Sequence, residues 1–82
     1  MLTGLYVIHD RLAEESGPVF QAPTLAVAHR NFRGLMEGAN VGHPDEYRLL
    51  HIGNYDNQRS TIEAFAVPSD VTQQYAKAEV VE

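Results

Sequence analysis

Cysteine is absent from this chain of 82 residues, so neither a disulfide nor a thiolate metal site can stabilise it. A domain this short buries only about 60% of the surface that its unfolded chain exposes, which makes its stability marginal. Association with further copies is a common remaining source of stability for such a small domain. The sequence therefore predicts a single domain that forms a homo-oligomer, with a dimer favoured.

Long apolar runs are also missing. The longest uninterrupted run falls far short of the roughly 20 residues that a membrane-spanning helix needs. The opening segment, MLTGL, has neither the basic region nor the apolar core of a signal peptide. We therefore expect a protein that has no membrane partner and is not exported by a standard signal. The lack of cysteine is compatible with a reducing cytoplasm.

Positive charge is scarce, because 6 Lys and Arg residues stand against 11 Asp and Glu residues and the net charge is −5. This balance argues against sequence-independent coating of nucleic acid, which depends on neutralising phosphates. Arginine nevertheless outnumbers lysine five to one, and all five arginines precede residue 69. Arginine is the better side chain for forked phosphate contacts and for stacking. A local basic patch on an acidic protein therefore stays open.

Catalytic and cofactor motifs are missing as well. The four histidines lack the mutual spacing and the carboxylate neighbours of a metal site or a hydrolase. The glycines do not form a phosphate-binding loop, and no serine lies in a G-x-S-x-G motif. The sequence therefore predicts no catalytic residue, no metal site and no cofactor, and the protein is not expected to be an enzyme.

What the chain does contain is a set of short strand patterns around one helix. Branched and aromatic residues predict strands at 5–9, 19–22, about 46–55 and 61–65. Between the second and third of these, apolar residues recur at helical spacing, with Thr24 as the N-cap and Gly38 as the stop signal. Pro68 is expected to end the last strand.

The order β-β-α-β-β predicts an α+β fold of two layers, in which one helix covers one face of a four-stranded, mostly antiparallel sheet. One helix cannot cover both faces. The strand at 46–55 carries Tyr47 and Leu49 on one face and Leu50 and Ile52 on the other. We expect another copy or a ligand to cover the second face. The domain is predicted at 1–68, and 69–82 is predicted to be a polar tail that is a short helix or disordered.

Aromatic residues on the strands and arginines near them suggest a site for single-stranded DNA. Rings on an open sheet face can stack bases, and arginines beside them can bind phosphates. The candidate DNA-binding residues are three tyrosines and three arginines: Tyr6, Tyr47, Tyr55, Arg30, Arg33 and Arg48. The alternative is that the rings belong to the core or to a dimer interface, and that the helix arginines simply face solvent.

Several short segments occur in a specific order. They are YVIHDR at 6–11, PVF at 18–20, AHRNF at 28–32, PDEYRL at 44–49, IGNYD at 52–56 and AVP at 66–68. Together they resemble the small nonstructural protein of gokushovirus-like microviruses, which are tailless bacteriophages with circular single-stranded DNA genomes. The resemblance covers residues 5–68. Two departures lie in loops: the stretch before Pro44 is shorter, and the turn at 56–60 lacks the usual glycine.

The resemblance implies a non-enzymatic nonstructural protein of the host bacterial cytoplasm that is not a component of the virion. It would act in synthesis or packaging of the viral single-stranded DNA genome, and it brings no catalytic residues. Our first hypothesis is direct binding of single-stranded DNA. The alternative is a homodimeric adaptor that docks the phage replication initiator or the procapsid without touching DNA. The acidic charge favours the adaptor, and the concentration of arginine favours DNA binding.

Overall fold

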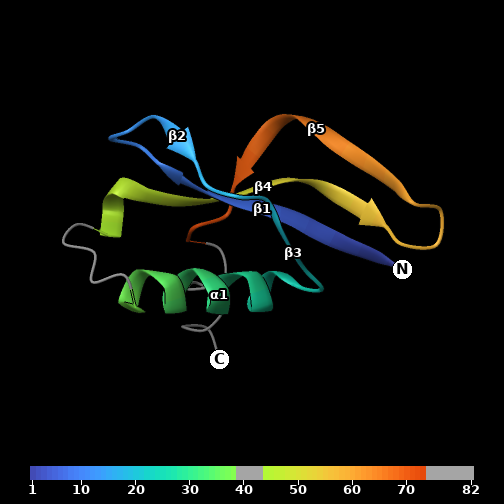
Figure 1. Cartoon of the computed structure of the whole chain (residues 1–82), viewed down its shortest axis with the longest axis horizontal. Helices are drawn as coiled ribbons and strands as arrows, with labels where there is room; N and C mark the ends of the chain where they lie inside the picture. Colours follow the sequence, from blue (N-terminus) through green and yellow to red (C-terminus); the bar gives the residue numbers. More distant parts are fainter. Residues whose placement is uncertain (39–43, 74–82) are drawn as a thin grey trace.

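The structure, a computed structural model, describes residues 1–38 and 44–73. One helix lies against a curled antiparallel sheet (Figure 1), which confirms the predicted α+β class. In chain order the elements are β1 (Leu2–Asp10), β2 (Glu15–Ser16), β3 (Phe20–Ala22), α1 (Leu25–Gly38), the 3-10 helix η1 (Pro44–Glu46), β4 (Tyr47–Asp56) and β5 (Thr61–Asp70).

The strand order across the sheet is β2-β1-β4-β5, and β3 also pairs with β1. β4 accompanies β1 along its whole length, and both β2 and β3 occupy the other edge of β1. The predicted order is therefore matched in part. The return strand predicted at 19–22 is β3, whereas β2 was not predicted because two residues are too few to produce a hydrophobic pattern.

The helix begins and ends where the sequence predicts. Thr24 caps it, because its Oγ1 accepts a hydrogen bond from the backbone N–H of Val27 at 3.2 Å. The last helical residue is Gly38. The buried side of α1 consists of Ala28, His29 and Phe32. Leu35 continues the same apolar stripe but is 53% exposed, so the stripe is longer than the surface that the sheet covers.

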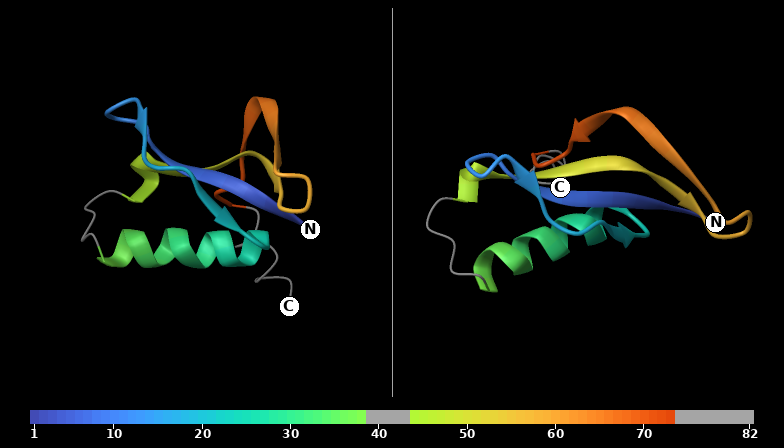
Figure 2. Two further views of the ribbon diagram at one scale, coloured as in Figure 1. Left: turned by 45° about the vertical axis from the view of Figure 1, so that its right-hand side comes forward. Right: turned by 45° about the horizontal axis from the view of Figure 1, so that its top comes forward.

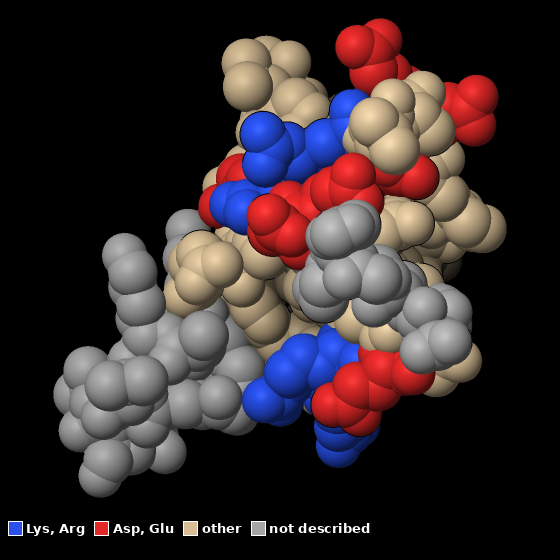
Figure 3. Space-filling model, turned by 90° about the vertical axis from the view of Figure 1, so that its left-hand side faces the viewer, with Lys and Arg blue, Asp and Glu red and all other residues tan. Residues whose placement is uncertain are grey.

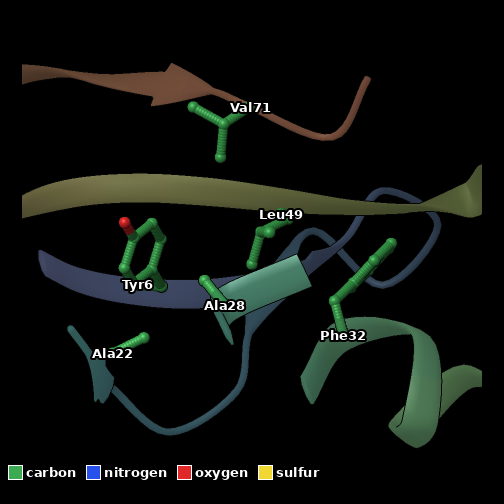
Figure 4. Close-up of a cluster of buried hydrophobic side chains, with 6 residues drawn as sticks. All are labelled: Tyr6, Ala22, Ala28, Phe32, Leu49 and Val71. Atoms are coloured by element: carbon green, nitrogen blue, oxygen red, sulfur yellow. The ribbon is translucent and has the colours of Figure 1, made fainter. Parts of the chain in front are cut away.

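The hydrophobic core lies between α1 and the sheet. Figure 4 shows its six buried side chains, which come from the helix, from three strands and from the segment after β5: Tyr6, Ala22, Ala28, Phe32, Leu49 and Val71. Leu49 and the two alanines are completely inaccessible to solvent. The core is small, as expected for a chain of 82 residues.

The prediction that Pro68 ends the last strand is wrong, because β5 continues to Asp70. The strand pairs with β4 in two separate stretches, and the register shifts between the pair Gly53–Ala64 and the pair His51–Ser69. Residues 65–68 therefore form an arch opposite a single residue of β4. Pro68 lies in this arch, where no ladder hydrogen bond is required of it.

Residues 69–73 belong to the folded domain and are not a tail. Ser69 and Asp70 are the last residues of β5, and Val71 is 4% exposed in the core. The backbone N–H of Val71 donates to the carbonyl oxygen of Leu49 at 3.0 Å. The predicted boundary at residue 68 is therefore too early. The rest of the predicted tail, 74–82, lies outside the described residues.

The face of the sheet opposite α1 carries apolar side chains that the described chain covers only in part. Figure 2 shows the end of the β1–β2 hairpin and the arch of β5 rising on this side, with α1 on the other. Register places five large apolar residues here, which we call the open face: Leu5, Val7, Leu50, Tyr55 and Ile62. Val7 is 6% exposed, whereas Ile62 is 65% exposed.

Ile52, which was predicted beside Leu50, lies in a β-bulge of β4. Leu5 pairs with Gly53 and Tyr6 pairs with His51, so Ile52 is the extra residue between them. Such a bulge re-aims the side chains beyond it. Tyr47 and Tyr55 are eight residues apart, so in a regular strand both would lie on the same face. The bulge explains why Tyr55 lies on the open face instead.

Candidate functional site

Four rings form a row across the strands, one from each of β3, β1, β4 and β5. In that order they are Phe20, Tyr6, His51 and Phe65, and their successive ring centroids are 5.9, 4.7 and 4.7 Å apart. The first three are neighbours in register. Contacts of this kind stabilise strand pairing. Sequence reasoning missed the place of His51 in the row, which only the strand register could reveal.

Tyr6, predicted to stack DNA bases, is 4% exposed and belongs to the core. Its ring lies over Gly4, where an added Cβ would come within 2.6 Å of Tyr6 Cε1. Burial raises the pKa of the Tyr6 phenol above its ordinary value of 10.0. In this conformation the ring fills the space above Gly4 and offers no free face to a base.

The other two predicted tyrosines lie on opposite sides of the sheet. Tyr47 is half-buried and packs against the core on the side of α1. Tyr55 is half-buried on the open face, opposite Thr3 on one neighbouring strand and Ile62 on the other. The structure therefore does not bring the three tyrosines together on one exposed surface.

The predicted arginines lie in two places. Arg30 and Arg33 are exposed on the outer side of α1, and their spacing of three residues makes them neighbours on the helix surface. Arg48 lies in β4, where its Nε donates to Asp70 Oδ2 at 2.8 Å. The structure therefore brings Arg30 and Arg33 together, and it places Arg48 apart from them in an ion pair.

Asp70 joins the end of β5 to β4 and to the segment that follows. Burial by itself would raise the pKa of the Asp70 carboxyl, but hydrogen bonds from Arg48 and Thr72 outweigh it and hold the pKa below 3.8. Thr72 Oγ1 donates to Asp70 Oδ1 at 2.7 Å, and Thr72 Oγ1 also accepts from the backbone N–H of Leu49 at 2.8 Å. Sequence reasoning missed this cluster because it placed residues 69–82 in a tail.

Acidic and basic side chains are interleaved on the surface at the β1–β2 end of the sheet and the C-terminal end of α1. Figure 3 shows them in two groups, one at the level of the sheet and one at the level of the helix, and neither sign forms an extended patch. Arg11 Nη1 donates to the carbonyl oxygen of Asp45 at 3.5 Å, and Arg59 Nε lies 4.0 Å from Asp56 Oδ2. Together with Arg48, which is paired with Asp70, Arg59 therefore has a carboxylate beside it, whereas Arg11 contacts a neutral backbone oxygen.

A solvent-open groove of ≈ 630 Å³ lies between the β1–β2 hairpin, β3, the C-terminal half of α1 and the start of β4. Its lining includes the apolar residues Ile8, Phe20, Leu35, Met36 and Tyr47. Near it, His9 Nδ1 and Ser16 Oγ lie 2.9 Å apart in a hydrogen bond. Sequence reasoning missed the groove, because its residues come from four separate segments.

Neither a metal-ligand cluster nor a membrane-spanning helix occurs within residues 1–38 and 44–73. No three His, Asp or Glu side chains gather there in a way that could hold a metal ion. No helix in the same ranges is long and apolar enough to cross a membrane. Three surfaces of the described chain remain as candidate functional sites: the open face, the outer side of α1 and the groove.

Comparison with protein families identifies the chain as a bacteriophage protein. The model of one phage family matches residues 3–77, which is most of the chain. The chain belongs to this family, the Phage ORF5 protein family. No curated protein and no solved structure matches the chain.

Proposed function

We propose that this Phage ORF5 family member is a nonstructural protein of the gokushovirus-like microvirus type, acting without catalysis in synthesis or packaging of a single-stranded DNA genome. The family match over residues 3–77 supports a phage role. The ordered motifs between residues 5 and 68 support the microvirus type. The protein acts in the host bacterial cytoplasm and stays outside the virion, and its partner is the phage replication initiator or the procapsid.

We further propose that it acts as a homodimeric adaptor. The observation that carries this proposal is the open face, where apolar residues of β1, β4 and β5 lie side by side and Ile62 is 65% exposed, although Val7 is already buried within the chain. A second copy is the occupant that we assign to this face. The small core of each chain supports this choice, because burying a second apolar surface between two copies adds stability that one copy lacks.

The charge distribution supports the adaptor over a DNA-coating protein. The net charge is −5, and Arg48 and Arg59 are close to carboxylates. To bind a phosphate, Arg48 would have to give up its ion pair with Asp70. Binding a protein partner does not require Arg48 to leave Asp70, because interfaces between proteins depend on apolar anchors surrounded by polar groups.

Sedimentation velocity of the full chain over about 5 to 500 µM tests the homodimer, since association follows mass action. We expect a mass of twice 9.1 kDa at the upper concentrations. Ile62→Lys should return the chain to 9.1 kDa, because a charged group would have to be buried in the interface.

Leu12→Lys is the matched control, because Leu12 is 78% exposed and lies outside the open face. This variant should remain a dimer. A monomer at every concentration would contradict the homodimer. A dimer that persists in Ile62→Lys would contradict the open face as its interface.

Direct binding of single-stranded DNA is the second candidate, and the pair Arg30 and Arg33 on the outer side of α1 favours it. Fluorescence anisotropy of a labelled single-stranded oligonucleotide at about 50 and 200 mM salt tests it, with duplex DNA as a comparison. If it is correct, replacing both arginines by Ala weakens binding and lowers its salt dependence. Arg59→Ala, which changes an arginine in the β4–β5 turn, serves as the control. Absence of binding at the lower salt concentration would eliminate this candidate.

A further inference from the structure

The groove beside the C-terminal half of α1 has the features of a binding site, and it lies apart from the open face. Its walls are apolar and come from both layers of the fold, with Ile8 and Phe20 on the sheet and Leu35 and Met36 on the helix. Leu35 is 53% exposed although it continues the apolar stripe of α1. A volume of ≈ 630 Å³ is within the range of sites that bind small molecules, and is large enough to take a bulky side chain.

The polar part of the groove is negative. Asp10 and Glu15 are the two ionisable carboxylates in its lining. Asp10 is held in place, because its Oδ1 accepts the backbone N–H groups of Leu12 and Ala13 at 3.0 and 3.1 Å in the turn after β1. Glu15 is exposed at the start of β2. Both carboxylates therefore stand next to apolar walls, at positions fixed by the hairpin.

The end of the helix adds to this negative character. The last turn of α1 contains no basic residue. The partial negative charge at a helix C-terminus therefore has no cation from that turn beside it. Leu35 and Met36, which line the groove, belong to the same turn. A ligand with positive charge is thus favoured from two sides of the groove.

We propose that this groove binds a peptide segment in which one bulky apolar side chain is flanked by Lys or Arg. The apolar side chain enters between Phe20, Leu35 and Met36, and the basic side chains lie against Asp10 and Glu15. The proposal is independent of the homodimer and of DNA binding, because none of these residues belongs to the open face or to the arginine pair on α1. Nucleic acid is disfavoured here, since its phosphates would face the same carboxylates.

A titration monitored by the backbone amide signals of the ¹⁵N-labelled full chain tests the proposal. The probe is the synthetic peptide Gly-Ser-Lys-Phe-Arg-Ser-Gly. Two further peptides are compared with it, one with Glu in place of both basic residues and one with Ser in place of Phe. We expect signal changes concentrated at Ile8, Phe20, Leu35 and Met36, and binding about tenfold weaker for each comparison peptide.

Variants of the protein test the charged rim and the apolar wall of the groove one at a time. Glu15→Lys should weaken the probe about tenfold by reversing a rim charge, and Leu35→Asp should weaken it by placing a charge on the apolar wall. Their matched controls are Glu63→Lys and Val67→Asp, at exposed positions of β5 outside the groove. Equal binding of the three peptides, changes centred elsewhere, or no binding at millimolar peptide would overturn the proposal. Dimer formation through the open face is unaffected by any of these outcomes.

Discussion

Gly53 occupies a position in β4 where the backbone of β5 comes very close. A Cβ at this residue would collide with the carbonyl oxygen of Glu63 and would lie 3.2 Å from the Cα of Ala64. The neighbour is backbone, which cannot swing away as a flexible side chain could. Glycine is therefore required here by the close approach of the two strands at the point where their register shifts.

We expect Gly53→Ala to lower the free energy of unfolding by about 1–3 kcal/mol, because the extra methyl group forces β5 to move. Urea unfolding followed by circular dichroism measures this change. Gly34→Ala is the control, since no atom lies within 4 Å of a Cβ there and the residue is helical. It should stabilise the chain by about 0.5–1 kcal/mol. Equal stabilities for the two variants would contradict the account of Gly53.

His29 holds the segment after β5 against the helix. It is 3% exposed, and its Nε2 donates to the carbonyl oxygen of Val71 at 2.7 Å. Because a carbonyl can only accept, the ring carries its proton on Nε2 in this contact. The residue therefore connects α1 to a part of the chain that lies 42 positions further on.

We expect His29→Leu to destabilise the protein by about 1–3 kcal/mol, since the buried carbonyl of Val71 loses its donor. Thermal and urea unfolding give the measurement. His9→Leu provides the comparison, because the hydrogen bond of His9 to Ser16 is exposed. That substitution should change stability by no more than about 0.5 kcal/mol. If both histidine variants lose the same stability, the contact with Val71 is not what holds the segment.

At the scale of elements, local patterns predicted α1, β1, β3 and β4 well, and failed for β5. The helix shows its cap, its stop signal and its apolar spacing in consecutive residues, so the prediction needed no tertiary information. The course of β5 past Pro68 depends on an arch, and the arch depends on a register shift against β4. No pattern inside residues 61–70 encodes that shift. The same reasoning explains why Val71 was assigned to a tail.

The ion pair between Arg48 and Asp70 makes the attachment of β5 sensitive to acid. The pKa of Asp70 is lowered from 3.8 in the folded protein. Its stabilising contribution is therefore fully present above pH 3.8 and is lost as the pH falls through the lower folded-state pKa. The contribution is at most about 1 kcal/mol, because the Asp70 side chain is 43% exposed and solvent screens the pair.

Asp70→Asn should therefore reduce the loss of stability between about pH 6 and pH 3, as measured by urea unfolding at the two pH values. Arg48→Gln should cost stability at the higher pH. The double variant should cost less than the sum of the two single changes, since both remove the same interaction. Strictly additive effects would show that the two side chains do not interact in solution.

At the scale of the whole molecule, the sequence predicted the kinds of surface better than their positions. It predicted a second sheet face with apolar side chains, and the open face carries Leu50 as expected. It could not predict that Tyr6 and Tyr47 lie on the side of α1 while Tyr55 lies on the open face, because a bulge at Ile52 changes the alternation. The groove was beyond sequence reasoning, since tertiary folding alone brings its walls together.

We propose that the open face is the contact surface between two copies of the chain. An isotope-filtered nuclear Overhauser experiment on a mixture of ¹³C-labelled and unlabelled chains tests it directly. We expect intermolecular signals from the methyl groups of Leu5, Leu50 and Ile62 and none from Leu12. Intermolecular signals confined to other methyl groups, or none at concentrations where the chain has the mass of a dimer, would contradict it.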